Sequence, residues 1–205
     1  MPSRNVIRYD APESYYHVYA RGNSKQPIFL DEEDSQFFCA LFARYLSILA
    51  QKSQFGEQYP HYRGRVQLLA YCLMGNHFHL LLYQADQKDI SSFMQSLLTS
   101  YTRHFNNRHK RSGSLFESRY KASRIDSDGY LQHISRYIHL NPRYWQRYPL
   151  SSITAYLQPD TTPEWLQPQK ITELFPGAGQ YKAFVSDYEA HKEMLDELKY
   201  ELADQ

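Results

Sequence analysis

The stretch LLAYCLMGNHFHLLL, residues 68–82, decides the fold of this 205-residue chain. Two apolar runs are separated there by Gly75-Asn76, a dipeptide that interrupts regular structure and favours a tight turn. Leucine and aromatic side chains are prominent in both runs, and each run has the length of one strand. We therefore expect a β-hairpin whose arms lie in the middle of a sheet.

The second arm of this hairpin contains His77-Phe78-His79. Residues two apart in a strand share a face, so both imidazoles point one way and Phe78 points into the core. Two imidazoles at this spacing are a natural pair of metal ligands, and the buried run that follows would hold them on a rigid element. The alternative is that they are two exposed or stacked histidines on a sheet face.

Outward from the hairpin, the pattern alternates between strand and helix. Apolar residues at period two predict strands, those at helical spacing predict helices, and Pro142 must end the last helix. The predicted strands are 15–21, 66–74, 77–83 and 115–125, and the predicted helices are 31–49, 89–106 and 128–141. This order is that of an α+β fold, a split-βαβ antiparallel sheet of ferredoxin or RRM type with helices packed on one face.

Charge divides the chain into two unlike parts. The whole sequence has 23 Lys and Arg against 22 Asp and Glu, which argues against a polycation. Residues 1–150 nevertheless carry +7 and residues 151–205 carry −6, with a Pro-, Ser- and Thr-rich connection between them. We expect a main domain, 1–150, and an acidic, partly helical extension, 151–205, ending in a helix at 180–201. The extension either shields the basic surface or presents a solvated face, the more common role of acidic helix positions.

Cysteines and hydropathy indicate the compartment. Cys39 and Cys72 stand in apolar surroundings without a CxxC partner, so both are expected to be small buried hydrophobes in a reducing environment. The chain opens without a basic-then-apolar leader, and its longest apolar stretch, 37–50, is interrupted by Arg44. We therefore expect a cytoplasmic protein without contact to a membrane.

The basic stretch from 101 to 124 is the strongest sign of a nucleic-acid partner. Aromatic residues are interspersed among the basic residues of this stretch, and Glu117 is its one acidic residue. Cations follow phosphates and rings stack on exposed bases, as a single strand or hairpin requires. The alternative is a solvated charged face. The basic residues are Arg103, Arg108, Lys110, Arg111, Arg119, Lys121 and Arg124.

Two shorter patterns add candidate contacts. The loop after the first strand contains Arg21, Asn23 and Lys25, which suit contacts to bases or phosphates unless the loop is a simple turn. The last helix of the main domain contains Tyr137 and Asn141, four residues apart and hence on one face. A phenol and an amide oxygen there would suit a nucleophile and a hard ligand for a divalent cation. Alternatively, the tyrosine packs on the sheet and the asparagine caps the helix.

Four collinear segments together resemble a known family, the REP-associated tyrosine transposases, relatives of the single-strand HUH insertion-sequence transposases. The resemblance spans nearly all of the first 145 residues, and its most distinctive parts are the HFH strand, the RSGxLF turn and the YIHLNP helix end. The segments are YHVYARGN (16–23), LLAYCLMGNHFHLLL (68–82), SYTRHFNNRHKRSGSLFESRYKA (100–122) and YLQHISRYIHLNP (130–142).

The resemblance implies a role for each matching residue. His77 and His79 match the HUH metal ligands, Asn141 matches the third ligand, and Tyr137 matches the catalytic tyrosine. The implied activity is a single-strand DNA endonuclease and strand-transferase that uses Mg²⁺ or Mn²⁺ and forms a 5′-phosphotyrosine link at REP-type hairpins. Insertion-sequence relatives are dimers, but the longer chain here leaves room for a monomer acting in cis.

Two other functions remain open at this stage. A split-βαβ sheet also serves RNA recognition, so a non-catalytic hairpin DNA- or RNA-binding protein with a vestigial metal site is the main alternative. A zinc hydrolase fits less well because no third His, Asp or Glu has recognisable zinc spacing to the histidine pair.

Overall fold

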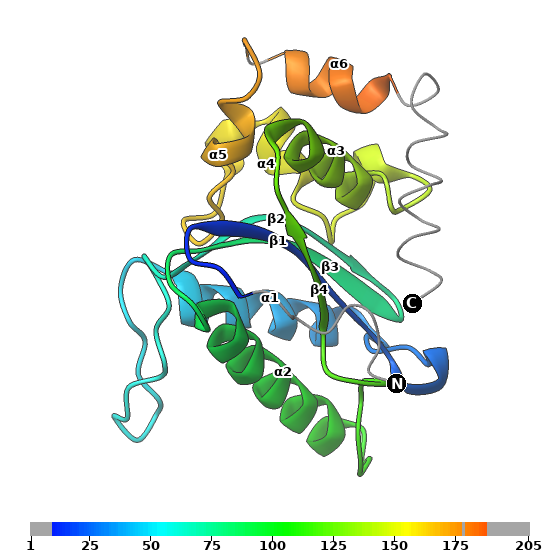
Figure 1. Ribbon diagram of the computed structural model, residues 1–205. Coiled ribbons are helices and arrows are strands. Elements are labelled where there is room, and N and C mark those ends of the chain that lie inside the picture. The colour runs from blue at the N-terminus through cyan, green and yellow to red at the C-terminus, as the bar shows by residue number, and fades with distance from the viewer. Residues whose placement is uncertain (1–9, 178, 188–205) are drawn as a thin grey trace.

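The computed structural model describes residues 10–177 and 179–187, and an antiparallel four-stranded sheet lies at its centre (Figure 1). The strand order is β2-β3-β1-β4, which is the order of a split-βαβ fold. The α+β class expected from the sequence is therefore confirmed. The strands are β1 (Ser14–Arg21), β2 (Val66–Met74), β3 (His77–Gln84) and β4 (Lys121–Ile125).

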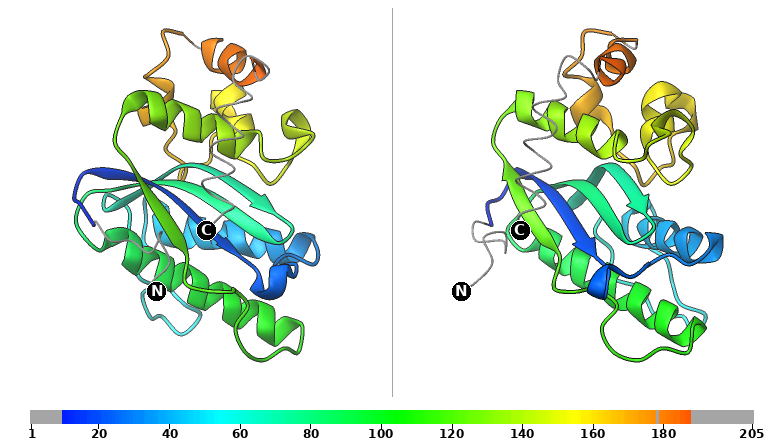
Figure 2. Two further views of the ribbon diagram at one scale, coloured as in Figure 1. Left: turned by 45° about the vertical axis from the view of Figure 1, so that its right-hand side comes forward. Right: turned by 90° about the vertical axis from the view of Figure 1, so that its right-hand side faces the viewer.

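Helices cover the sheet on both faces (Figures 1 and 2). The α-helices are α1 (Glu32–Leu46), α2 (Asp89–Arg108), α3 (Asp128–His139), α4 (Ile153–Leu157), α5 (Gln169–Thr172) and α6 (Gln180–Ser186). Short 3₁₀ turns are η1 (Asn23–Lys25), η2 (Trp145–Arg147) and η3 (Pro159–Thr161).

The first face is covered by α1 and α2. Phe38 and Phe42 from α1 and Phe93 from α2 are fully buried against Phe78 and Leu80 of β3. Burying side chains of this size stabilises the fold by about 1.5–3 kcal/mol each. These helices are the ones that the helical spacing of apolar residues predicted.

The second face is covered by α3 and by the short helices that follow it. Leu81 and Cys72 from the central strands are buried against Ile134 and Ile138 of α3 and Val185 of α6. The expectation that the helices share one face is corrected here. The physical reason is that β3 is apolar on both sides, and such a strand needs cover on both.

A β-bulge between Leu68 and Ala70 changes the phase of β2. Leu68 packs in the α1–α2 core, as Tyr71 does, whereas Leu69 and Ala70 both pack on the α3 side. Two consecutive residues on one face are possible because a bulge sets two residues opposite one on the partner strand.

The fourth strand is shorter than predicted. Residues 115–125 were expected to be extended and paired throughout, but β4 begins at Lys121. Leu115 and Phe116 are both buried, but the ladder between β1 and β4 ends at the pair of Tyr19 and Lys121 and does not extend to them. Phe116 instead makes an isolated bridge to Gly22.

Residues 151–187 are joined to the sheet by backbone and side-chain contacts. Bridges connect Cys72 to Ser151 and Leu68 to Leu166. The helix expected at 180–201 is observed as α6, and the rest of that range lies outside the described residues. Among the described helices, none combines the length and the apolar character that a membrane span requires.

Candidate active site

His77 and His79 lie near the start of β3, on the face that α3 covers. His79 is buried, with 4% of its surface exposed, and His77 is half-buried. The antiparallel register pairs His77 with Arg21 and His79 with Tyr19 of β1. The alternation expected from the sequence holds, because Phe78 between them is fully buried on the opposite face.

Helix α3 brings Tyr137 over the histidine pair. Its ring centroid lies 5.5 Å from that of His79, in an edge-on arrangement. The helix starts with Ser127 as N-cap, whose hydroxyl accepts a hydrogen bond from the Tyr130 amide. It ends at His139, so Asn141 follows in the turn before the proline, where its side chain lies beside both His77 and Tyr137.

The last turn of α3 is fixed to the rest of the second layer through His139. This imidazole is fully buried, with Nδ1 2.6 Å from the Tyr181 hydroxyl and Nε2 2.7 Å from the Ser152 hydroxyl. Both nitrogens are therefore satisfied by residues from outside α3. The contact fixes the helical turn that contains Tyr137.

Burial controls the protonation of the site. It lowers the pKa of His77 to about 4, with Arg21 adding to the effect, and it lowers the pKa of His79 well below its usual value. The pKa of Tyr137 is raised to about 12, mainly by burial and in addition by Tyr19. Arg21 and the Asn141 side chain act in the opposite direction. At neutral pH the imidazoles are uncharged, as metal ligands must be, and the phenol is protonated.

The donor set fits a divalent cation of the Mg²⁺ or Mn²⁺ kind. His77 and His79 offer imidazole nitrogens, and Asn141 offers an amide oxygen beside them. Over residues 10–177 and 179–187, no three His, Cys, Asp or Glu side chains form a group suited to a metal ion. A metal here would therefore be held by this mixed set, whose amide differs from the His, Cys and carboxylate ligands usual in zinc enzymes.

His17, a buried histidine of β1, belongs to the site but was not predicted. Its Nε2 lies 2.9 Å from His79 Nδ1, and the two rings stack at a centroid distance of 5.1 Å. Its ring centroid is also 5.8 Å from that of Tyr137. The available signal was a polar residue in the apolar strand 15–21, in phase with Arg21.

The loop after β1 reaches the same end of the sheet. Gly22 is required there, because a Cβ atom would lie 2.1 Å from the Gln26 carbonyl oxygen. The tight turn places Asn23 and Lys25, both exposed, beside the hairpin turn, where the Lys25 carbonyl accepts from Asn76. Together with Arg21, these predicted DNA contacts therefore surround the histidine pair.

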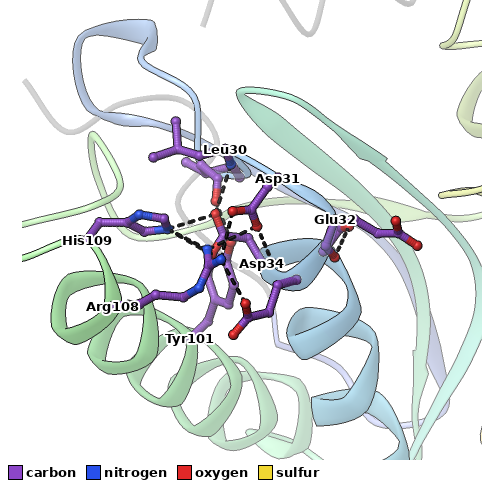
Figure 3. Close-up of polar contacts among 10 residues, drawn as sticks. Leu30, Asp31, Glu32, Asp34, Tyr101, Arg108 and His109 are labelled. Atoms are coloured by element: carbon purple, nitrogen blue, oxygen red, sulfur yellow. Dashed lines mark hydrogen bonds and ion pairs between the residues drawn. The ribbon is translucent and has the colours of Figure 1, made fainter.

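Arg108 differs from the other predicted DNA contacts because acids surround it (Figure 3). Its guanidinium donates to Asp31 at 2.7 Å, to Glu33 at 2.8 Å and to Asp34 at 2.9 Å. The basic stretch appeared unbalanced in the sequence, but these three acids come from the start of α1. Arg108 thus joins α1 to α2.

The remaining predicted DNA contacts lie in two groups, which the structure does not bring to the histidines as closely as Arg21. Arg103, Lys110 and Arg111 lie on or just after α2, and Arg111 stacks on Phe105 at 5.6 Å. The other group follows the edge of the sheet. In this group Arg119 lines a cavity of about 560 Å³ together with Tyr120 and Asp10. The Lys121 ammonium lies 5.8 Å from the centroid of the Tyr19 ring, and Arg124 is exposed.

Comparison with known proteins places this site in a family. The family model described as "Transposase IS200 like" matches residues 11–141, from the start of β1 to Asn141. The chain belongs to the IS200-like transposase family. The matched range contains every residue of the candidate site, and membership indicates a DNA-processing role of the transposase type.

One solved structure resembles this IS200-like transposase in fold, and a second matches less well. A REP-associated tyrosine transposase, described as bound to a REP hairpin, matches with a TM-score of 0.54 and 14% identity over 80% of this chain and 92% of that one. A protein of Deinococcus radiodurans R1, provisionally assigned as a transposase, matches with a TM-score of 0.39 and 17% identity over 65% and 93%. The comparison with curated proteins found no match.

Proposed function

We propose that the protein is a metal-dependent single-strand DNA endonuclease and strand-transferase that acts at REP-type hairpins. The observation that supports this most directly is the meeting of Tyr137, Asn141, His77 and His79 at one end of the sheet. These residues come from a strand and a helix about 60 positions apart in a transposase-family chain. A binding protein would have no need of a tyrosine beside two uncharged imidazoles.

The proposed reaction uses Tyr137 as nucleophile. Its oxygen forms a bond to the scissile phosphorus while the bond from phosphorus to the 3′ oxygen breaks. The products are a 5′-phosphotyrosine link and a free 3′-OH, so the energy of the phosphodiester is kept for rejoining. His77, His79 and Asn141 would hold Mg²⁺ or Mn²⁺, which would supply a Lewis acid to polarise the phosphate and offset its developing charge.

The residues around the phenol prepare it for this step. Its pKa of about 12 means that few molecules are ionised at neutral pH, so activation is required. Arg21 and Asn141 both lower that pKa, and Arg21 also places a positive charge where a phosphate would approach. The chain thus provides groups that favour the phenolate and the bound anion together.

The proposed substrate follows from charge and from the structural relative. Asn23 and Lys25 lie at the same end of the sheet as the site, and exposed cations further away lie on or just after α2 (Arg103 and Lys110) and along the edge of the sheet (Arg119 and Arg124). Phosphate contacts of this kind suit a folded single strand. The REP-associated transposase with the same fold is described as bound to a REP hairpin.

We also propose that one chain forms a complete active site in the cytoplasm. Tyr137 reaches the His79 ring of its own chain at 5.5 Å, so no second subunit is needed to supply the nucleophile. Sedimentation of the purified protein tests the monomer: a dimer at the concentration that supports cleavage would contradict it.

The experiment that tests the function is covalent trapping. A labelled REP-type hairpin with a 5′ single-stranded extension is incubated with Mn²⁺, and the products are separated on a denaturing gel. We expect a protein–DNA adduct with the natural protein and with Tyr144→Phe, which alters an exposed tyrosine, and none with Tyr137→Phe or with EDTA. An adduct that survives Tyr137→Phe would refute the assignment, and hairpin binding without any cleavage would favour the binding-protein alternative.

A further inference from the structure

Two polar side chains outside the proposed donor set contact the two histidines from behind. His17 lies against Nδ1 of His79 at 2.9 Å, and Asn76 lies against Nδ1 of His77 at 2.7 Å. In both cases the contact is made to Nδ1. The two contacts come from different elements, the β1 strand and the hairpin turn.

The orientation of the Asn76 amide can be deduced from its second contact. One end of this amide lies 3.1 Å from the Lys25 carbonyl oxygen, which can only accept a hydrogen bond. That end must therefore be Nδ2, and the end that faces His77 is the oxygen. Since Oδ1 only accepts, His77 Nδ1 must carry the proton and donate it. The lone pair of the neutral His77 ring is then on Nε2.

The His17–His79 contact leads to the same tautomer by a steric route. His17 occupies the Nδ1 side of the His79 ring at hydrogen-bond distance, so a cation can approach that ring only at Nε2. An imidazole that offers Nε2 to a metal carries its proton on Nδ1. His79 Nδ1–H then donates to His17 Nε2.

The burial of His17 is difficult to explain by packing alone. It is 0% exposed, yet its Nδ1 has no hydrogen-bond partner among the residues that the structure describes. A buried polar atom left without a partner costs about 1–3 kcal/mol, which an apolar residue at this position would not incur. Such a cost is retained where the polar atom has a function.

We infer that His17 and Asn76 are positioning residues that set His79 and His77 in the same tautomer, with proton on Nδ1 and lone pair on Nε2. The inference rests on the proposed metal site and adds to it the two residues that prepare the site before any cation binds. His17 and Asn76 act through these two histidines and are not members of the proposed donor set.

The first test reads the tautomers directly in the metal-free protein. Long-range ¹H–¹⁵N spectra distinguish a protonated ring nitrogen from one with a lone pair, and His77→Gln and His79→Gln assign the signals. We expect Nδ1–H for both histidines in the natural protein. In His17→Phe, which keeps a ring but cannot accept, His79 becomes a mixture of tautomers, whereas His17→Gln, which retains an acceptor, restores Nδ1–H. Asn76→Ala and Asn76→Asp form the same pair for His77.

The second test measures affinity for Mn²⁺ by electron paramagnetic resonance, without DNA or turnover. Loss of such outer contacts weakens metal binding by about 10–100-fold, which we expect for His17→Phe and Asn76→Ala. His17→Gln should recover most of that loss. His61→Phe is the matched control, because His61 bonds the Ser47 carbonyl away from the site. Thermal melting confirms that each variant is folded.

The outcomes separate this inference from the proposed function. Nε2–H on either histidine of the natural protein, or Mn²⁺ affinity in His17→Phe equal to that of the natural protein, overturns the inference. If the natural protein binds no Mn²⁺, the proposed function fails, and the tautomers measured in His17→Phe alone test the positioning role. A changed tautomer at His79 then supports that role, and an unchanged one overturns it.

Discussion

Asp34 connects the two helices of the first layer, and its removal should destabilise the protein strongly. Its carboxylate is 0% exposed and accepts from the Leu30 amide at 2.9 Å, from Arg108 at 2.9 Å and from His109 at 2.9 Å (Figure 3). Asp34→Ala therefore leaves a backbone donor and two side chains without this acceptor.

The magnitude follows from burial and from the partners that survive. Removing one partner of a buried charged pair costs about 3–5 kcal/mol. Arg108 keeps its contacts to Asp31 and Glu33, so we expect the lower end of that range, about 3 kcal/mol. Asp34→Asn retains an oxygen for the Leu30 amide and loses the charge, so we expect about 2 kcal/mol, the scale of one hydrogen bond to a charged group.

The assay is urea unfolding at pH 7, monitored by circular dichroism. Variants are compared where the free energy of unfolding depends on urea concentration with the same slope. Glu32→Ala is the control, since Glu32 has the same charge in the same helical turn but is exposed, and its carboxylate bonds only Gln36 among the described residues. Exposed changes of this kind stay within about 0.5 kcal/mol. The reasoning is refuted if Asp34→Ala costs less than about 1 kcal/mol more than Glu32→Ala.

Three further predictions concern charge and protonation. Burial lowers the pKa of His139 to about 3, whereas an unfolded histidine has a pKa of about 6.5. Below pH 6.5 this residue therefore binds a proton in the unfolded chain but not in the folded one. The free energy of unfolding, which is highest above pH 6.5, falls as the pH decreases. Between pH 7 and 5.5, the free energy of unfolding measured in urea should fall by about 1 kcal/mol less in His139→Asn than in the natural protein. An equal fall in both would show that this histidine does not contribute to the pH dependence. Arg103→Gln should weaken hairpin binding and reduce, by about 1, the slope of the logarithm of the binding constant against the logarithm of the salt concentration. Arg108→Gln should lower the melting temperature and leave this slope unchanged. Burial raises the pKa of Cys39 and Cys72 to about 12, so a thiol reagent at pH 8 should label neither until urea unfolds the chain; rapid labelling would show that they are accessible.

The local parts of the site could be predicted from the sequence because each depends on a short spacing. The alternation around Phe78 puts His77 and His79 on one face, and the spacing of four residues puts Asn141 beside Tyr137 even though α3 ends at His139. That these two faces meet was implied by the family resemblance. No local spacing specifies which face of a sheet a helix covers, which is why α3 was expected beside α1 and α2.

Contacts between distant segments account for what the sequence did not reveal. The acids around Arg108 lie more than 70 positions earlier, so the basic stretch appeared uncompensated. His17 contacts His79 across 62 positions, and only the strand register makes them neighbours. Asn76 was recognised as a turn residue, although the same side chain also contacts the neighbouring histidine.

The bulge in β2 and the alternation in β3 make the protein sensitive to chain length in a way that single substitutions do not reveal. Inserting one residue between His79 and Leu80, with the rest of β3 kept in register, would move Phe78 to the ligand face and both imidazoles into the aromatic core. Deleting the extra residue of the bulge would likewise turn Val66 and Leu68 away from the core that they now fill. In a library of single-residue insertions and deletions, survivors should therefore be rare across 66–82 and common in the exposed stretch 51–58. The spacing of the residues is thus as necessary to the active site as their chemistry.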